Sequence, residues 1–314
     1  MKQLRSALTD LSVKIGSVTF QNPVFVASGT FGYGLEASGL MDQSRLGAIV
    51  TKSITLHPRE GNPPPRIVET DSGMLNSIGL ANVGVEKYIT DFLPRFSTLK
   101  ANIITNIAGW TEVEYVEVLN KLESVSSVIT GYEINISCPN VKKGGMEFGV
   151  DPATAERLTA TLRRNTEKLL IMKLSPNVTD IGQIARAVEN GGADAISAIN
   201  TVVGMSVNPL TRKPNIHTTY GGLSGPAIKP IGLAMVHKIH QAVRIPIIGI
   251  GGIVSGLDAV EYLLAGATAI QVGTANFRTP DAAVKILEEI EDYVREQNIA
   301  NVSSLTGQLQ SYEK

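Results

Sequence analysis

The chain alternates short apolar runs, often of β-branched residues, with longer segments whose apolar residues recur at helical spacing. In one such segment Ile181, Ile184, Ala185 and Val188 form a single apolar face. Eight runs predict strands, and they begin at Val24, Ala48, Asn102, Tyr132, Leu169, Ala195, Pro246 and Thr268. Several runs are apolar throughout, which is typical of parallel strands covered on both faces. The pattern therefore predicts an α/β fold, a single (β/α)8 TIM barrel.

Three segments are additions to this minimal barrel. Residues 11–23 contain two short alternating runs and predict an N-terminal β-hairpin that closes one end of the fold. Residues 53–83 and 201–223, rich in Gly, Pro and Asn, predict long structureless insertions after the second and sixth strands, at the C-terminal face. Such loops usually cover a binding site. No composition break marks a second domain, so we expect residues 1–314 to form one domain.

Ligand-capable residues stand at the C-terminal end of every predicted strand, which is where barrel enzymes hold their active sites. Two lysines at equivalent strand ends favour an anionic ligand, although either alone could pair with a buried carboxylate. Glycines after the last two strands suit a phosphate, although they could belong to ordinary turns. In strand order the set is Ser28 and Gly29, Lys52, Asn106, Asn135 and Cys138, Lys173, Asn200 and Thr201, Gly251 and Gly252, and Gly273 and Thr274.

Cys138 is the only cysteine of the chain, and it follows the fourth predicted strand at the point where Pro139 ends it. A lone cysteine is more often a small buried hydrophobic residue. Its neighbours Ser137 and Asn140 instead place it at the mouth of a polar loop, which favours a reactive thiol. A single thiol excludes an internal disulfide and cannot by itself hold a four-thiolate iron–sulfur cluster.

Composition and charge narrow the classes of partner. The chain is 43% hydrophobic and 18% charged, with a net charge of -1, which gives no electrostatic basis for binding nucleic acid or an acidic membrane. No signal peptide or membrane-spanning run is expected, and the single cysteine suits the cytoplasm. The four histidines show no metal-ligand clustering, and the Gly32–Ala37 segment is a weak match to a dinucleotide fingerprint, which we discount.

Nine segments, in order, together carry a family resemblance. They are NPVFVASGTFGYG, KSITLHPREGNPPPR, GMLNSIGLAN, NISCPNVKKGG, KLSPN, NTVVGM, GGLSGPAIKP, GIGGI and QVGTA. From about Leu11 to past Thr274 the chain resembles the dihydroorotate dehydrogenases, the FMN enzymes of pyrimidine biosynthesis. The membrane-associated class of that family has serine at the position of Cys138 and an N-terminal membrane-binding extension. This chain has cysteine at that position, and no membrane-binding extension is expected. It therefore resembles the soluble class 1 enzymes.

The resemblance implies oxidation of (S)-dihydroorotate to orotate in de novo pyrimidine (UMP) biosynthesis, in the cytoplasm. The NISCPNVKKGG and KSITLHPREGN segments are most similar to the B-type catalytic subunit. That type forms a homodimer core with two electron-transfer subunits, a heterotetramer in which the partner holds FAD and a [2Fe–2S] cluster and reduces NAD. The A-type enzyme, which uses fumarate and no partner, is the nearest alternative. Two alternatives are more distant. The chain could be a phosphate-binding barrel isomerase or lyase without flavin, or it could be a non-catalytic flavin carrier.

The resemblance also implies roles for individual residues. FMN is expected to contact Ser28, Lys52, Ser53, Asn106, Asn135, Lys173, Ile199, Gly225, Gly251, Gly252, Gly273 and Thr274. The pyrimidine is expected to contact Lys52, Asn76, Ser77, Ile78, Gly79, Leu80, Asn135, Asn200 and Thr201. Lys173 would favour the negative charge on the reduced flavin, and Cys138 would be the general base. Residues 138–148 are expected to form a mobile lid.

Overall fold

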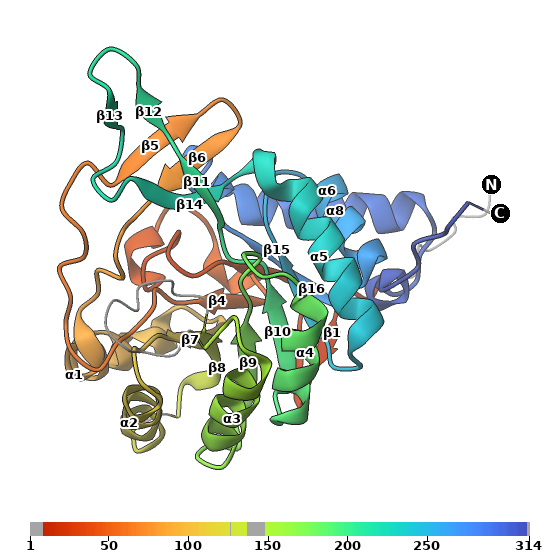
Figure 1. Cartoon of the computed structure of the whole chain (residues 1–314). Coiled ribbons are helices and arrows are strands. Elements are labelled where there is room, and N and C mark those ends of the chain that lie inside the picture. Colours follow the sequence, from red (N-terminus) through yellow and green to blue (C-terminus); the bar gives the residue numbers. More distant parts are fainter. Residues whose placement is uncertain (1–8, 126, 137–147, 313–314) are drawn as a thin grey trace, which may run out of the picture.

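A closed parallel barrel lies at the centre of the computed structural model, which describes residues 9–125, 127–136 and 148–312 (Figure 1). In chain order its strands are β3 (Val24–Val26), β4 (Ala48–Val50), β7 (Asn102–Ile107), β8 (Ile129–Asn135), β9 (Leu169–Lys173), β10 (Ala195–Ala198), β15 (Ile247–Ile250) and β16 (Ala269–Val272). Each strand pairs with the next along the chain, and β16 pairs with β3 to close the ring. The predicted (β/α)8 barrel is confirmed.

Helices surround the barrel and bury their apolar faces against it (Figure 1). They are α1 (Gly84–Lys87), α2 (Glu112–Glu123), α3 (Pro152–Arg163), α4 (Ile181–Asn190), α5 (Lys229–Ala242), α6 (Gly256–Ala265), α7 (Ala275–Arg278) and α8 (Ala282–Glu296). The predicted apolar face of α4 is buried, and the side chain of Asp180 caps its first turn. Shorter helical turns are η1 (Leu35–Ala37), η2 (Gln43–Arg45), η3 (Tyr88–Phe92), η4 (Leu93–Thr98), η5 (Pro226–Ile228) and η6 (Val302–Leu305).

The N-terminal hairpin closes the end of the barrel at which the strands begin. Strands β1 (Val13–Ile15) and β2 (Val18–Phe20) pair antiparallel, as predicted. The turn at Gly16 lies beside Leu169 and Asp194, close to where β9 and β10 begin. The ring of Phe20 packs 4.8 Å, centroid to centroid, from that of Phe25. The opposite end of the barrel is therefore the one available to a ligand.

The two long insertions are not structureless, so that prediction was wrong. They contribute β5 (Ile67–Thr70), β6 (Gly73–Asn76), β11 (Val202–Met205) and β14 (Tyr220–Ser224) to one sheet in the order β11-β14-β6-β5. Residues from the two insertions pair directly, as Leu223 does with Leu75. The strands could not be recognised locally because each is paired with a segment far away in the sequence. A small hairpin, β12 (Val207–Asn208) with β13 (Lys213–Pro214), projects beyond this sheet (Figure 1).

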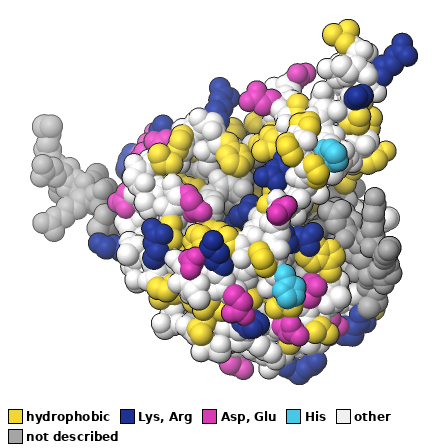
Figure 2. Space-filling model, turned by 90° about the vertical axis from the view of Figure 1, so that its left-hand side faces the viewer, with side chains coloured by type: hydrophobic (Ala, Val, Ile, Leu, Met, Phe, Trp, Pro, Cys, Tyr) yellow, Lys and Arg dark blue, Asp and Glu magenta, His cyan; other side chains and the backbone are white. Residues whose placement is uncertain are grey.

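The surface carries charges of both signs. Acidic and basic side chains are interspersed on the face shown in Figure 2, in keeping with the net charge of -1. None of the helices in the described part of the chain combines the length and the apolar character that crossing a bilayer requires.

Candidate active site

A large cavity opens at the C-terminal ends of the barrel strands, on the side of the sheet β11-β14-β6-β5. Its volume is about 1330 Å³, and residues from the strand ends and from both insertions line it. Pockets for one small molecule typically measure about 300–1,000 Å³. The cavity can therefore hold a cofactor and a substrate side by side.

The structure brings most of the predicted site residues together around this cavity. Those that line it are Ser28, Lys52, Ser53, Asn76, Ser77, Ile78, Gly79, Leu80, Asn135, Lys173, Ile199, Asn200, Thr201, Gly225, Gly251, Gly252, Gly273 and Thr274. Asn106 does not line it: its side chain is fully buried in the barrel and donates to Glu133. Cys138 and nearly all of the expected lid, residues 138–148, lie outside the described residues, whereas Ile136 and Gly149 on either side line the cavity.

The cavity is lined by cations. Lys52, Lys173 and Arg66 all contribute to its wall, and no Asp or Glu does among the described residues. Burial lowers the pKa of Lys52, the charge of Arg66 lowers it further, and Glu36 opposes both effects. Lys173 is only 5% exposed and forms an ion pair with Glu133, whose Oε1 lies 3.5 Å from Nζ. An excess of positive charge in a partly dry cavity favours anionic ligands.

Amide side chains form a connected group beside Lys173. In the β-ladder Asn135 on β8 is the register partner of Lys173 on β9, so both side chains face the mouth of the barrel. Asn200 Nδ2 donates to Asn135 Oδ1 over 3.4 Å, and Asn200 Oδ1 accepts from the backbone of Thr201 at 2.8 Å. Asn177 Nδ2 donates to the carbonyl of Thr201 at 3.0 Å. Amides offer donors and acceptors together, which suits a ring of alternating N–H and C=O groups.

The segment from Asn76 to Leu80 is held in place by the preceding part of the same insertion. The side-chain amide of Asn62 donates to the carbonyl of Ser77 at 2.9 Å, and the backbone N–H of Asn62 donates to that of Ile78 at 3.0 Å. The buried hydroxyl of Ser77 has no hydrogen-bond partner among the described residues. A buried hydroxyl without a hydrogen bond costs free energy, and a hydrogen bond to a ligand in the cavity would remove that cost.

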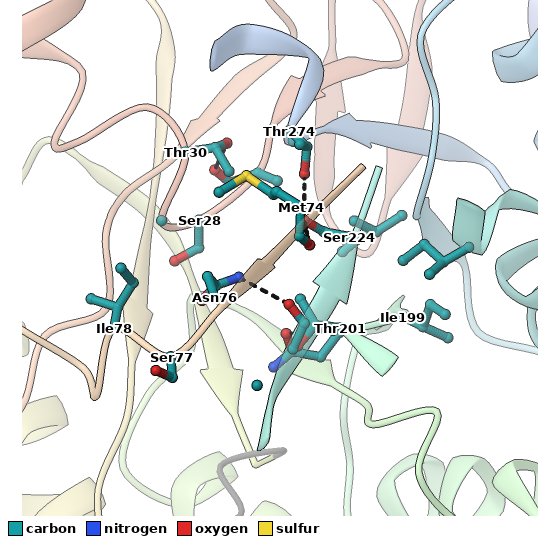
Figure 3. A pocket seen from close by; sticks show the side chains of 18 of the residues that line it. Ser28, Thr30, Met74, Asn76, Ser77, Ile78, Ile199, Thr201, Ser224 and Thr274 are labelled. Atoms are coloured by element: carbon teal, nitrogen blue, oxygen red, sulfur yellow. Dashed lines mark hydrogen bonds between the residues drawn. The ribbon is translucent and has the colours of Figure 1, made fainter. Parts of the chain in front are cut away.

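Side chains from separate segments point into one space in Figure 3. Ser28 comes from the loop after β3, Asn76 from the end of β6, and Thr201 from the start of the second insertion. Asn76 Nδ2 donates to the carbonyl of Gly222 at 3.3 Å, which ties the two insertions together over the cavity. The binding surface is therefore assembled from parts of the chain that only the fold brings together.

Glycine backbones form the wall on the side of β15 and β16. Gly251 and Gly252 have φ angles of +131° and +70°, which side-chain-bearing residues rarely adopt. A Cβ on Gly273 would meet no atom closer than 3.6 Å, so its backbone is open to the cavity. The hydroxyls of Thr274 and Ser224 lie 2.8 Å apart, joining this loop to β14. Accessible backbone N–H groups beside hydroxyls suit a phosphate group.

The residues of the cavity wall that were not predicted from the sequence include Arg66, Asn177 and Ser224. Each stands inside a segment that carried the family resemblance, so a signal existed for all three. Arg66 follows a run of prolines in a segment expected to be a loop, where an arginine is usually solvated. Here its guanidinium donates to the carbonyls of Glu60 and Asn62 and so stays at the cavity wall.

The chain matches a known protein family over most of its length. The family model for dihydroorotate dehydrogenase matches residues 10–294. The chain belongs to the dihydroorotate dehydrogenase family. As a member it is an FMN-dependent oxidoreductase of pyrimidine biosynthesis, and the cationic, glycine-walled cavity fits a cofactor of this kind. The resemblance seen in the nine sequence segments is confirmed.

Individual relatives match nearly the whole chain. A protein of Geotalea daltonii named dihydroorotate dehydrogenase B (NAD(+)), catalytic subunit, is 52% identical over 303 residues, covering 96% of this chain and 99% of its own. A protein of the same name from Desulforamulus reducens is 52% identical over 298 residues, covering 95% and 98%. A protein of Aquifex aeolicus provisionally named dihydroorotate dehydrogenase A (fumarate) is 50% identical over 300 residues, covering 95% and 98%.

Proposed function

We propose that this protein oxidises dihydroorotate to orotate in the cavity at the C-terminal end of the barrel, as a single domain of residues 1–314. The observation that carries this proposal is one cavity, large enough for two ligands, with Lys52, Arg66 and Lys173 in its wall and no acidic residue among the described ones. FMN brings a phosphate and the substrate brings a carboxylate, so both ligands need positive charge or N–H donors.

FMN would be held by glycine backbones at one end and by lysine and amide side chains at the other. Gly251, Gly252, Gly273 and Thr274 suit its phosphate: all four line the cavity, Gly273 leaves its backbone open to it, and Thr274 adds a hydroxyl. When bound, FMN supplies the hydride acceptor of the reaction. Lys173, which lies almost buried at the barrel mouth, would stabilise the negative charge that reduction places on the flavin ring.

The substrate would lie against the amide residues and the segment after β6. Asn135, Asn200 and Thr201 offer donors and acceptors to the pyrimidine ring, and Ser77 offers its unpaired hydroxyl. Lys52 would pair with the substrate carboxylate. Cys138 would remove the proton from C5 of the ring as a thiolate, because the thiolate and not the thiol is the basic form. This assignment of Cys138 rests on the family resemblance and on its place in the sequence.

The charge of Lys52 gives a pH dependence that can be measured. Because its pKa is lowered by burial and by Arg66, the ammonium loses its proton below the usual lysine value. Orotate should therefore bind best at low pH and progressively more weakly as the pH rises through that lowered pKa. The measurement is a flavin-absorbance titration with orotate between about pH 7 and 10. Lys52→Arg keeps its charge over this range and should show a flatter profile; an equally steep profile would exclude Lys52 as the titrating group.

The electrons would leave through another polypeptide. The relatives named B-type carry NAD(+) and the word "subunit" in their names. The resemblance to the B-type implies a [2Fe–2S] cluster and FAD, and we place both on a partner, since the one cysteine of this chain cannot by itself hold a four-thiolate cluster. We propose a heterotetramer in the cytoplasm, with a homodimer core and two such partners. The relative provisionally named as the fumarate-using A-type supports the second candidate, direct reduction of fumarate.

Anaerobic reoxidation separates the two acceptors. The purified protein is first reduced with dihydroorotate, which should bleach the flavin band. NAD should then restore the band rapidly only when the partner subunit is present, and fumarate should restore it slowly in either case. Fast reoxidation by fumarate of the isolated chain would establish the A-type reaction instead. A protein that binds no FMN would refute the proposed oxidation altogether.

A further inference from the structure

Glu133 is a carboxylate buried inside the barrel with no exposed surface at all. It stands on β8, two residues before Asn135, so its side chain occupies the next interior position toward the start of the strand. Carboxylates are almost never fully buried unless they are paired, because removal from water costs several kcal/mol or more. The role of such a group must therefore be sought in what it contacts.

Three side chains from three other strands surround this carboxylate. Asn106 Nδ2 on β7 donates to Oε1 at 2.7 Å, and Gln271 Nε2 on β16 donates to Oε2 at 2.7 Å. Lys173 Nζ on β9 lies 3.5 Å from Oε1. We call these four residues the Glu133 cluster. Of its members, Lys173 alone lines the cavity, so Glu133 reaches the ligand site through Lys173.

Stability does not explain the cluster. Barrel interiors are usually filled by branched aliphatic residues, and a buried ion pair is often no more stable than apolar residues of similar size. What the pair changes is charge. Among the described residues, Lys52, Arg66 and Lys173 bring positive charge to the cavity wall, and Glu133 partly compensates the charge of Lys173. Without the charge of Glu133, Lys173 would face the ligands uncompensated.

We propose that Glu133 is a positioning residue that fixes the ammonium of Lys173 and limits the positive charge beneath the cofactor. In this way it sets how strongly the site prefers reduced FMN to oxidised FMN. The inference rests on the proposed placement of FMN. Reduction adds negative charge to the flavin, so every additional positive charge nearby favours the reduced form. By restraining that preference, Glu133 keeps the reduced cofactor able to pass its electrons onward.

The substitution Glu133→Gln tests this without removing the hydrogen bonds. Asn106 Oδ1 and Gln271 Oε1 are buried and have no partner among the described residues. Rotation of either amide would present its oxygen to the new NH2 group, while the other amide continues to donate. The variant thus keeps the shape and the hydrogen bonding of the cluster and loses one negative charge.

The readout is the ratio of the dissociation constants of oxidised and reduced FMN, obtained from the midpoint potential of the bound flavin. In Glu133→Gln the preference for reduced FMN should rise on the order of tenfold, the effect of a unit charge roughly 10 Å away at an effective dielectric constant near 20. For a two-electron couple this is a shift of about 30 mV to more positive potential. A purely structural role would lower thermal stability and leave this ratio unchanged.

Glu123→Gln is the matched control. Glu123 also pairs with a lysine, Lys168 at 2.9 Å, but neither residue lines the cavity, so its removal should leave the FMN ratio unchanged. An unchanged ratio or a more negative potential in Glu133→Gln would overturn the inference. If Glu133→Gln does not fold, Glu133→Met is the second variant. It removes the same charge at similar volume and should shift the ratio in the same direction. If neither variant folds, Glu133 serves folding and the inference is overturned. Wild-type protein without FMN would refute the proposed function instead.

Discussion

Replacing Cys138 with alanine should slow reduction of the flavin by dihydroorotate by about 10²- to 10⁴-fold, the usual contribution of a positioned general base. FMN should stay bound, because the residues proposed to hold its phosphate, Gly251, Gly252, Gly273 and Thr274, come from other segments of the chain. The measurement is anaerobic stopped-flow bleaching of the flavin after mixing with dihydroorotate. Wild-type rates should rise with pH as the thiol ionises, which for a free thiol occurs near ~8.5.

Cys138→Ser is the matched control for this prediction. A serine hydroxyl has the same shape but does not ionise in this range, so the pH dependence assigned to the thiol should disappear. An alanine variant with the wild-type rate of bleaching would remove Cys138 from the chemistry. A loss of FMN in the alanine variant would instead mean that Cys138 serves the cofactor site.

Lys173→Met should lower the free energy of unfolding by about 3–5 kcal/mol, the usual cost of leaving a buried charge without its partner. Glu133 has no exposed surface, and its remaining donors among the described residues would be the two amides of Asn106 and Gln271. The measurement is urea unfolding of the FMN-free protein, so that cofactor affinity does not contribute. The double variant Lys173→Met with Glu133→Gln should recover most of the loss, because no unpaired carboxylate remains.

Lys168→Met provides the comparison. Its ion pair with Glu123 leaves both side chains 25% exposed, so solvent screens the charge that remains. We expect a loss of at most about 1 kcal/mol there. Equal losses for Lys173→Met and Lys168→Met would show that burial of Glu133 does not make its charge costly.

The depth of a residue along its strand could not be predicted from the sequence. Asn106 and Lys173 both stand at the ends of apolar strands, and both were expected to contact FMN. Lys173 is the last residue of β9 and reaches the cavity, whereas Asn106 is followed by one more strand residue in β7 and points to Glu133 in the interior. The assignment of Asn106 to FMN stays a prediction, since its side chain does not line the cavity.

The sequence alone determined the number and order of the barrel strands and the gathering of strand-end residues at one rim. The apolar runs are local, and parallel strands share the edge at which they end. Only the tertiary structure decided the rest. The sheet over the cavity pairs segments from two insertions, as Leu223 with Leu75, and Glu133 meets Gln271 across 138 positions of sequence. Such partners are brought together by closure of the barrel and by pairing of the two insertions, which no local pattern of residues encodes.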